Sequence, residues 1–374
     1  MIMVNLRDYG WKCGIFPTGP TNSLMDVPGV SLGHQTLISG DGKLVPTIGP
    51  IRTGVSIIFP HQGNLYRKKV PAGVYIANAF GKSTGIPQIC ELGCIETPIA
   101  VTNTLNVGLV YDAIVEYMIR ENPDIGITTG SVSPIVAECY DGYLNDIQGR
   151  HVKTDHVMQA IQNAKTSKEV EEGSVGAATG FQVFQLKSGV GTASRILGKD
   201  VVNLEKNYHI AAVVFPNYGI FEDFLFYGNR MVDYLEEIKY FPYGRKKPSI
   251  IPQNMHGSII IVIATDLPLS SHQLTRLAKR GMNGIIWTGS HVSNGSGDFV
   301  FAFSTENQIS FEDVGVKKCK FISDYSSVME YAFRAVGELV QEALYKGMLA
   351  AKTLMGRDGH IAVALDIADL PKIN

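Results

Sequence analysis

The sequence predicts an α/β protein, and three observations support that prediction. Short apolar runs bounded by turn residues alternate along the chain with longer stretches whose apolar side chains recur at helical spacing. Thirty-nine glycines among 374 residues indicate many tight turns between compact elements. Because 45% of the residues are hydrophobic and 18% are charged, the chain can bury a large core, as one big domain or as two closely fused ones.

The expected elements follow one another in mixed order. The stretch 104–121 carries a helical stripe that is closed by Asn122-Pro123, and a longer stripe over 324–355 is followed by Gly356. The remaining expected elements are strands at 53–59, 210–215, 258–264 and 299–303 and helices at 154–165 and 271–282. Sheets buried under helices follow from this pattern.

Charge and apolar patterning exclude several classes of protein. Lysine plus arginine number 33 against 35 acidic residues, a formal charge of −2, so no global field recruits nucleic acid or an anionic membrane. We expect the basic residues at 245–247 to lie in a solvated loop and those at 276–280 to lie on the solvent-exposed face of a helix. The start of the chain lacks the pattern of a secretory signal, and no apolar run approaches the roughly 18 residues of a membrane span. A cytoplasmic enzyme is expected.

Cysteine and histidine spacing predicts neither disulfides nor a metal. The five cysteines are few and odd in number, which suits a reducing compartment. Cys90 and Cys94 lie four apart, but no neighbouring pair completes a tetrahedral shell, so we interpret both as core thiols. The nine histidines show no metal-binding spacing. We expect no metal and no cofactor.

Two glycine motifs are interpreted as structural. GVSLG at 29–33 matches the pattern of a nucleophile elbow, but Pro28 precedes it and no helix is expected after it, so a turn is favoured. GSVGAATG at 173–180 and GVGTAS at 189–194 lack the full spacing of phosphate-binding loops, which favours close-packed backbone.

The dipeptide Gly257-Ser258 marks the sharpest change in the chain. A basic, proline-containing stretch over 239–257 ends there, and the apolar strand SIIIVIATD begins on the serine. Cleavage of the backbone before Ser258 would give this residue both a hydroxyl nucleophile and an α-amino group. The simpler alternative is a serine that only turns the chain, which is common at such junctions.

A family resemblance favours the catalytic alternative. The segment from Gly257 through SIIIVIATDLPLSSHQLTRLAKRG to TGSHVSNGSGDFVFAFST resembles the carboxy-terminal half of the DmpA-type aminopeptidases, the P1 family of self-processing serine peptidases that includes the β-peptidyl aminopeptidases. NSLMDVPGVSLGHQT, RTGVSIIFP, TPIAVTNTLNVGLVYDA, AECYDGYLNDI, GSVGAATGFQVFQLKSGVGTASR and VVFPNYG resemble the remainder, in the same order. The turn AFGKSTG after Asn78 departs from relatives, which often carry an acidic, glycine-rich turn there.

The resemblance implies a fold and an assembly. The expected fold is a four-layer αββα sandwich of the N-terminal nucleophile hydrolase kind, formed by one catalytic domain over 1–374. That domain would be processed into 1–257 and 258–374, with the 239–257 stretch as a processing loop inside one fold. A homotetramer of cleaved protomers is implied, with a small peptide or amino-acid amide as substrate.

The resemblance also assigns roles around the nucleophile Ser258. Ser296 would hydrogen-bond Ser258, and Asp298 would orient that network; some relatives have glutamate at this position. Without the resemblance, NGSGD at 294–298 is an ordinary hairpin turn. The side-chain amide of Asn217 would stabilise the oxyanion, although Pro216-Asn217-Tyr218-Gly219 also has turn composition.

Two residues are assigned to the substrate's amino end. Glu138 lies in the apolar stretch PIVAEC, where a buried carboxylate needs a cationic partner. That partner is a substrate ammonium in the family, while the sequence leaves an internal lysine or arginine equally open. Tyr140 would donate its phenol proton into the same site or would simply pack as an aromatic.

The mechanism expected from these roles starts with attack of the Ser258 hydroxyl on the carbonyl of Gly257. The resulting ester is hydrolysed, and Ser258 then forms acyl-enzymes with N-terminal residues of peptides, amides or esters. Either the freed α-amine or the Ser296 and Asp298 network takes the proton. The alternatives are an acyltransferase of the same self-cleaving type and a non-enzymatic small-molecule-binding protein.

Overall fold

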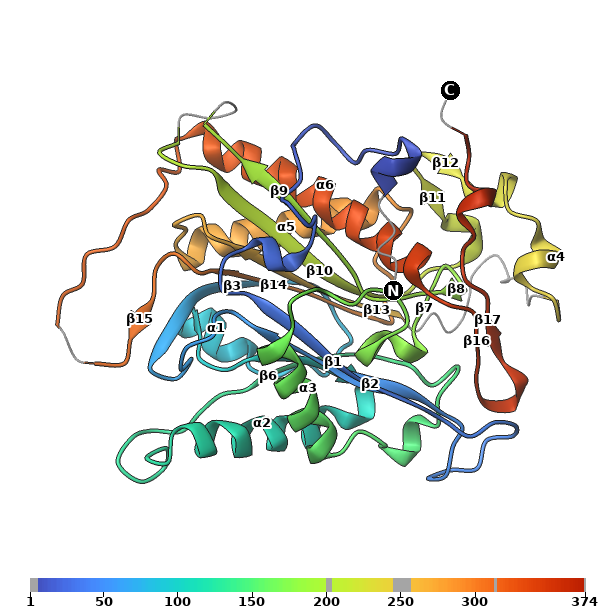
Figure 1. The fold of residues 1–374 in the computed structure, drawn as a ribbon, viewed down its shortest axis with the longest axis horizontal. Coiled ribbons are helices and arrows are strands. Elements are labelled where there is room, and N and C mark those ends of the chain that lie inside the picture. The colour runs from blue at the N-terminus through green and yellow to red at the C-terminus, as the bar shows by residue number, and fades with distance from the viewer. Residues whose placement is uncertain (1–5, 200–203, 245–256, 313–314, 373–374) are drawn as a thin grey trace.

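Two sheets lie face to face between two layers of helices in the computed structural model (Figure 1). The structure describes residues 6–199, 204–244, 257–312 and 315–372. Helices α2 and α3 form the lower outer layer in the view of Figure 1, and α5 and α6 form the upper one. The αββα arrangement expected from the family resemblance is therefore present.

The smaller sheet has four strands in the order β1-β2-β5-β6. Its strands and covering helices are β1 Ser31–Ser39, β2 Ile51–Phe59, β5 Ile99–Asn103, β6 Ile135–Cys139, α2 Val107–Glu121 and α3 Thr154–Thr166. The outer face of this sheet packs on α2 and α3 through Val55, Ile57 and Val136. β5 and β6 run parallel and end at the same edge, with Thr102 opposite Glu138.

The larger sheet has seven strands, with β13 and β14 at its centre. Its strands and covering helices are β3 Lys68–Ala79, β4 Cys94–Ile95, β9 Gly191–Leu197, β10 Tyr208–Asn217, β13 Gly257–Thr265, β14 Ser296–Ser304, β15 Ile309–Ser310, α5 Ser271–Ile286 and α6 Ser327–Ala350. β13 and β14 are parallel and are connected through α5, while β10 runs antiparallel to β13.

Alternation along β13 builds the two halves of the core. Ile259, Ile261 and Ile263 pack under α5 and α6, whereas Ile260 and Val262 face the smaller sheet. All nine residues of the strand are buried, as expected for a central strand covered on both faces. This burial fixes the register that places Ser258 near the start of β13, at one end of the central strands.

Short elements complete the chain outside the sandwich. They are α1 Ile86–Leu92, α4 Glu237–Tyr240, the hairpin β7 Gln182–Val183 and β8 Leu186–Lys187, the hairpin β11 Leu225–Phe226 and β12 Asn229–Arg230, and the pair β16 Leu354–Met355 and β17 Ile361–Ala362. In the described parts of the chain, no helix is long and apolar enough to cross a membrane.

Several sequence predictions need correction. The last long helix ends at Ala350, not near 355, because the chain turns outward and Leu354–Met355 pairs with β17. Cys94 is buried as expected, but Cys90 is exposed on α1, which ends at Leu92 before Cys94. The basic group at 245–247 lies outside the described residues.

The glycine motifs are structural, as predicted for close-packed backbone. A Cβ at Gly191 would stand 1.8 Å from the carbonyl oxygen of Ala343, so only glycine lets β9 lie against α6 here. GVSLG places Ser31 at the start of β1, where no helix follows it. A nucleophile elbow at this serine is excluded by that geometry.

Candidate active site

Ser258 lies where the ends of three strands meet. In the central strand β13 it is paired with Asn217 at the end of β10 and with Gly297 near the start of β14. Its side chain is almost fully buried, and its hydroxyl donates a hydrogen bond of 2.6 Å to the carbonyl oxygen of Gly257. The hydroxyl is therefore in contact with the peptide group that the sequence predicts it to attack.

Gly257 is closely packed against its neighbours. The residue lies in extended strand and is not one of the glycines with positive φ, so a left-handed backbone does not explain it. A Cβ at this position would stand 3.1 Å from the Cβ of Tyr218 and 3.3 Å from the Oγ of Ser296. Close packing around the scissile carbonyl is therefore the feature that favours glycine here.

Ser296 and Asp298 lie on β14 opposite Gly257 and Ile259 of β13, and both side chains are buried. The Ser296 hydroxyl donates a hydrogen bond of 2.5 Å to Oδ1 of Asp298, and burial raises the pKa of that carboxyl to about 6. In the uncleaved chain the Ser258 hydroxyl is directed to Gly257, and these described residues show no hydrogen bond from it to Ser296. NGSGD is not a hairpin, because β14 begins at Ser296 and runs parallel to β13.

Asn78 braces this part of the site and was missed by the sequence analysis. Its side-chain amide donates hydrogen bonds to the backbone carbonyls of Ser293, Asn294 and Ser296. The pairing of β3 with β14 is interrupted by a bulge directly after Asp298. Bulges next to active sites commonly re-aim side chains. Only the turn composition after Asn78 hinted at this role.

Asn217 is held in one orientation by two backbone groups. Its Oδ1 accepts a hydrogen bond of 2.9 Å from the amide of Gln182, and its Nδ2 donates one of 2.6 Å to the carbonyl of Tyr140. A backbone N–H donor must face an oxygen, so the side-chain amide nitrogen points toward Tyr140. The second proton of that NH₂ group is available for an oxyanion. Asn217 ends a strand and is not part of a simple turn.

Lys187 supports the hairpin that holds Asn217. This lysine is fully buried, and its Nζ donates hydrogen bonds to the backbone carbonyls of Ala178, Phe181 and Ser188. The hydroxyl of Ser188 in turn donates to the carbonyl of Pro216. No pattern in the sequence identified this contact, because Lys187 stands in the mixed stretch FQLKSG.

Glu138 lies at the end of β6, across the inter-sheet space from Ser258. The carboxylate is buried; its Oε1 accepts a hydrogen bond of 2.9 Å from the amide of Lys82, and its Oε2 accepts one from the hydroxyl of Thr104. No ion pair joins Glu138 to a lysine or arginine of the described chain. A substrate ammonium stays the predicted partner of this carboxylate.

A cavity of about 260 Å³ lies between Ser258 and Glu138. Glu138, Tyr140, Gly257 and Ser258 line it, and Tyr140 also borders an adjoining cavity of about 250 Å³ that includes Asn217. The phenol of Tyr140 lies against Gly142, where a Cβ would be 2.4 Å from the hydroxyl oxygen. Tyr140 is 43% exposed, so it forms a wall of the site and is not a core aromatic.

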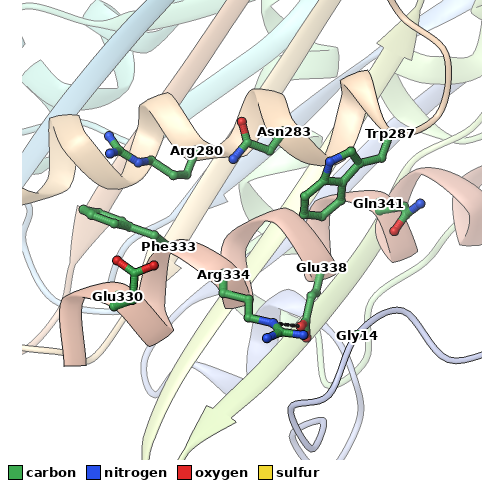
Figure 2. A pocket seen from close by; sticks show the side chains of 9 residues that line it. All are labelled: Gly14, Arg280, Asn283, Trp287, Glu330, Phe333, Arg334, Glu338 and Gln341. Atoms are coloured by element: carbon green, nitrogen blue, oxygen red, sulfur yellow. Dashed lines mark hydrogen bonds and ion pairs between the residues drawn. The ribbon is translucent and has the colours of Figure 1, made fainter. Parts of the chain in front are cut away.

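A separate cavity of about 570 Å³ lies between α5 and α6 (Figure 2). Arg334 pairs there with Glu338, and the guanidinium of Arg280 lies 4.1 Å from the ring centroid of Phe333. None of the residues that line it also lines the cavity at Ser258. The family-like serine and the buried carboxylate Glu138 line the other cavity, so the chemistry of this protein is expected at Ser258.

Comparisons with known proteins identify the family of this chain. The model of peptidase family S58 matches residues 22–362. A β-peptidyl aminopeptidase, BapA, from Sphingosinicella microcystinivorans is 39% identical over 360 residues, which cover 95% of this chain and 88% of the relative. A β-peptidyl aminopeptidase, BapA, from Sphingosinicella xenopeptidilytica is 36% identical over 343 residues. The match covers 90% of this chain and 83% of that relative.

Solved structures show the same fold. A protein from Pyrococcus horikoshii OT3 has a TM-score of 0.88 and 44% identity, covering 97% of this chain and 96% of that one. The L-aminopeptidase D-Ala-esterase/amidase from Ochrobactrum anthropi, described as a prototype of the serine aminopeptidases with a variant of the Ntn hydrolase fold, has a TM-score of 0.84 and 33% identity over 96% and 95% of the chains. The DmpA-type resemblance and the fold class are confirmed: this chain belongs to peptidase family S58.

Proposed function

We propose that this chain is a self-cleaving serine aminopeptidase that releases N-terminal amino acids from peptides, amides or esters through an acyl-enzyme on Ser258. Membership of a peptidase family and the named aminopeptidase relatives support the reaction class. The observation that carries the site assignment is the buried Ser258 hydroxyl at 2.6 Å from the Gly257 carbonyl oxygen, in a cavity shared with Glu138.

Self-cleavage begins with attack of the Ser258 Oγ on the carbonyl carbon of Gly257. The C–N bond breaks, the acyl group moves from nitrogen to oxygen, and the hydroxyl proton is transferred to the departing amine. Water then hydrolyses the ester, which leaves a carboxylate on Gly257 and a free α-amine and hydroxyl on Ser258. The products are the chains 1–257 and 258–374 of one catalytic domain.

Peptide hydrolysis uses the same oxygen. The substrate's ammonium pairs with Glu138, and Ser258 attacks the carbonyl of the N-terminal residue. One N–H of Asn217 stabilises the negative oxygen, which is the role of an oxyanion-hole donor. The leaving amine takes a proton, and water releases the amino acid from the acyl-enzyme. Tyr140 borders the position of the amine and confines it beside Glu138.

Two groups are candidates to take the proton of Ser258. The α-amine freed by cleavage has an ordinary pKa of roughly 7.7 to 8.0, so a useful fraction is unprotonated near neutrality. The Ser296 and Asp298 pair lies on the adjacent strand and accepts protons through the carboxylate. Profiles of kcat/KM against pH for wild type and Asp298→Asn distinguish the two.

The activity is tested with alanine and β-alanine p-nitroanilides and with a dipeptide. Wild type is expected to release free amino acid, and Ser258→Ala is expected to release none. Ser310→Ala, which changes a serine on the edge strand β15, is the matched control and retains activity. Formation of an acylated amine in place of free amino acid would identify an acyltransferase, and binding without turnover would identify a binding protein.

We further propose a cytoplasmic location and a homotetramer of cleaved protomers. The five cysteines are all free in the structure, which supports a reducing compartment. The tetramer is supported by the family resemblance and is checked by light scattering on the purified, cleaved enzyme.

A further inference from the structure

The turn Phe80–Lys82 forms one wall of the cavity that contains Glu138 and Ser258. Two backbone hydrogen bonds anchor it on either side of the cavity. The amide of Phe80 donates to the carbonyl of Ser296 at 3.2 Å, and the amide of Lys82 donates to the carboxylate of Glu138 at 2.9 Å. The turn is therefore tied both to the nucleophile's neighbour and to the amine-binding carboxylate.

Gly81 fixes the path of this turn between the two anchors. A Cβ there would stand 2.4 Å from the ring of Phe299 and 3.2 Å from the Cα of Gly297. A Cβ on Gly297 would in turn stand 2.6 Å from the Cα of Gly81. The two glycines allow the backbones to touch, so the side chain of Lys82 leaves from a defined point on the cavity wall.

The ammonium of Lys82 stays at this wall. Its Nζ donates a hydrogen bond of 3.0 Å to the backbone carbonyl of Phe80. The same Nζ lies 4.5 Å from the centroid of the phenyl ring of Phe80. Both residues line the cavity. No carboxylate of the described chain forms an ion pair with Lys82. One N–H of the ammonium is used in this hydrogen bond, and the other two donors remain open to a ligand.

The cavity thus carries one fixed charge of each sign. Among the described residues that line it, Glu138 is the only acidic group and Lys82 the only basic group. A substrate ammonium neutralises Glu138 and leaves Lys82 without an anion. An acyl residue that also bears a carboxylate satisfies both charges within the same cavity of about 260 Å³.

We propose that Lys82 selects substrates whose N-terminal residue carries a carboxylate in addition to its free amine. This inference rests on the proposed function of the site. The carboxylate is either the side chain of an α-linked aspartyl or glutamyl residue or the α-carboxylate of a β-linked aspartyl residue. Lys82 acts as a specificity-determining residue and takes no part in the bond-breaking step.

The effect has the size of a solvent-exposed ion pair. Such pairs change binding by about two- to fivefold and weaken as salt is added. Wild type is expected to show a higher kcat/KM for acidic than for lysyl substrates. Lys82→Ala is expected to lose two- to fivefold on acidic substrates, and Lys82→Glu is expected to reverse the order of acidic and lysyl substrates.

The experiment measures kcat/KM of the cleaved enzyme on p-nitroanilides of alanine, lysine, α-linked aspartate and β-linked aspartate. The variants are Lys82→Ala, Lys82→Glu and the matched control Lys279→Ala. Lys279 is also exposed and also lies near an aromatic ring, at 5.5 Å from the centroid of Tyr75, but it is on α5 outside this cavity.

The proposal predicts that only the two Lys82 variants change the ratio of acidic to alanyl kcat/KM, and that 0.5 M salt reduces the wild-type ratio. A larger effect on the α-linked or on the β-linked aspartyl substrate identifies which carboxylate Lys82 contacts. Equal losses on alanyl and both aspartyl substrates overturn the proposal while leaving aminopeptidase activity established. Failure of wild type to cleave even alanine p-nitroanilide overturns the proposed function itself.

Discussion

Replacing Glu138 by glutamine separates recognition of the free amine from the chemistry at Ser258. The glutamine side chain has the same shape as glutamate. Its oxygen can keep the hydrogen bond from the amide of Lys82, and the hydroxyl of Thr104 can rotate to accept from its NH₂ group. The local structure should persist, and the change removes the negative charge that faces the cavity.

The size of the effect follows from the charged hydrogen bond that the substitution removes between Glu138 and the substrate's ammonium. A hydrogen bond to a charged group contributes about 1.5–3 kcal/mol. A factor of ten corresponds to about 1.4 kcal/mol, so Glu138→Gln should lower kcat/KM for free-amine substrates by about 10- to 150-fold. An N-acetylated substrate has no ammonium to pair, and its kcat/KM should change little.

The assay compares alanine p-nitroanilide with its N-acetyl form in wild type and in Glu138→Gln. Glu116→Gln is the matched control, because Glu116 pairs with Arg120 on the exposed surface of α2. The ratio of free to acetylated kcat/KM should collapse only in the Glu138 variant. An equal loss on both substrates would refute a role in binding the amine and would assign Glu138 to the fold or to the chemical step.

Four further predictions follow from the same geometry. Asn217→Asp keeps the oxygen that accepts from Gln182 but removes the N–H donor. Steady-state kinetics should therefore show kcat reduced by about 10²- to 10³-fold, with an unchanged circular dichroism spectrum. A normal kcat would contradict the oxyanion role of Asn217. Burial raises the pKa of Asp298 to about 6, so kcat/KM should fall as pH drops through 6 and the carboxylate is protonated, and this limb should be missing in Asp298→Asn. Because the folded-state pKa lies above the ordinary 3.8, Asp298 should also make wild type less stable as pH rises from about 4 to 6, which pH-dependent urea unfolding of the two proteins checks. Gly257→Ala should slow self-cleavage roughly tenfold because its Cβ crowds Tyr218 and Ser296, and a gel time course showing wild-type speed would contradict the packing argument.

Much of the fold was predictable because its central elements have strong local signals. The apolar run after Ser258 became the fully buried strand β13, and the stripe ending at Asn122-Pro123 became α2. The four-layer arrangement could not be obtained from periodicity, because the pairing of β3 with β14 joins residues more than 200 positions apart. That part of the prediction came from the family resemblance.

The identities of the site residues were predicted from the sequence more completely than the contacts between them. Ser258, Ser296, Asp298 and Asn217 are brought to adjacent strand ends, which supports the roles assigned to them. The contacts of Asn78 and Lys82 were not predictable, because they depend on how one turn crosses the start of β14 in three dimensions. The sequence shows that the turn after Asn78 departs from its relatives, but it does not show which cavity this turn borders.

The central claim is that Ser258 becomes the nucleophile by cutting the chain before itself. Intact-mass analysis of freshly purified protein, with amino-terminal sequencing of the smaller fragment, tests this most directly. We expect two chains, the smaller beginning SIIIV, in wild type, and a single uncut chain of 40.8 kDa without activity in Ser258→Ala. A fully active wild-type preparation that consists only of the 40.8 kDa chain would contradict the claim.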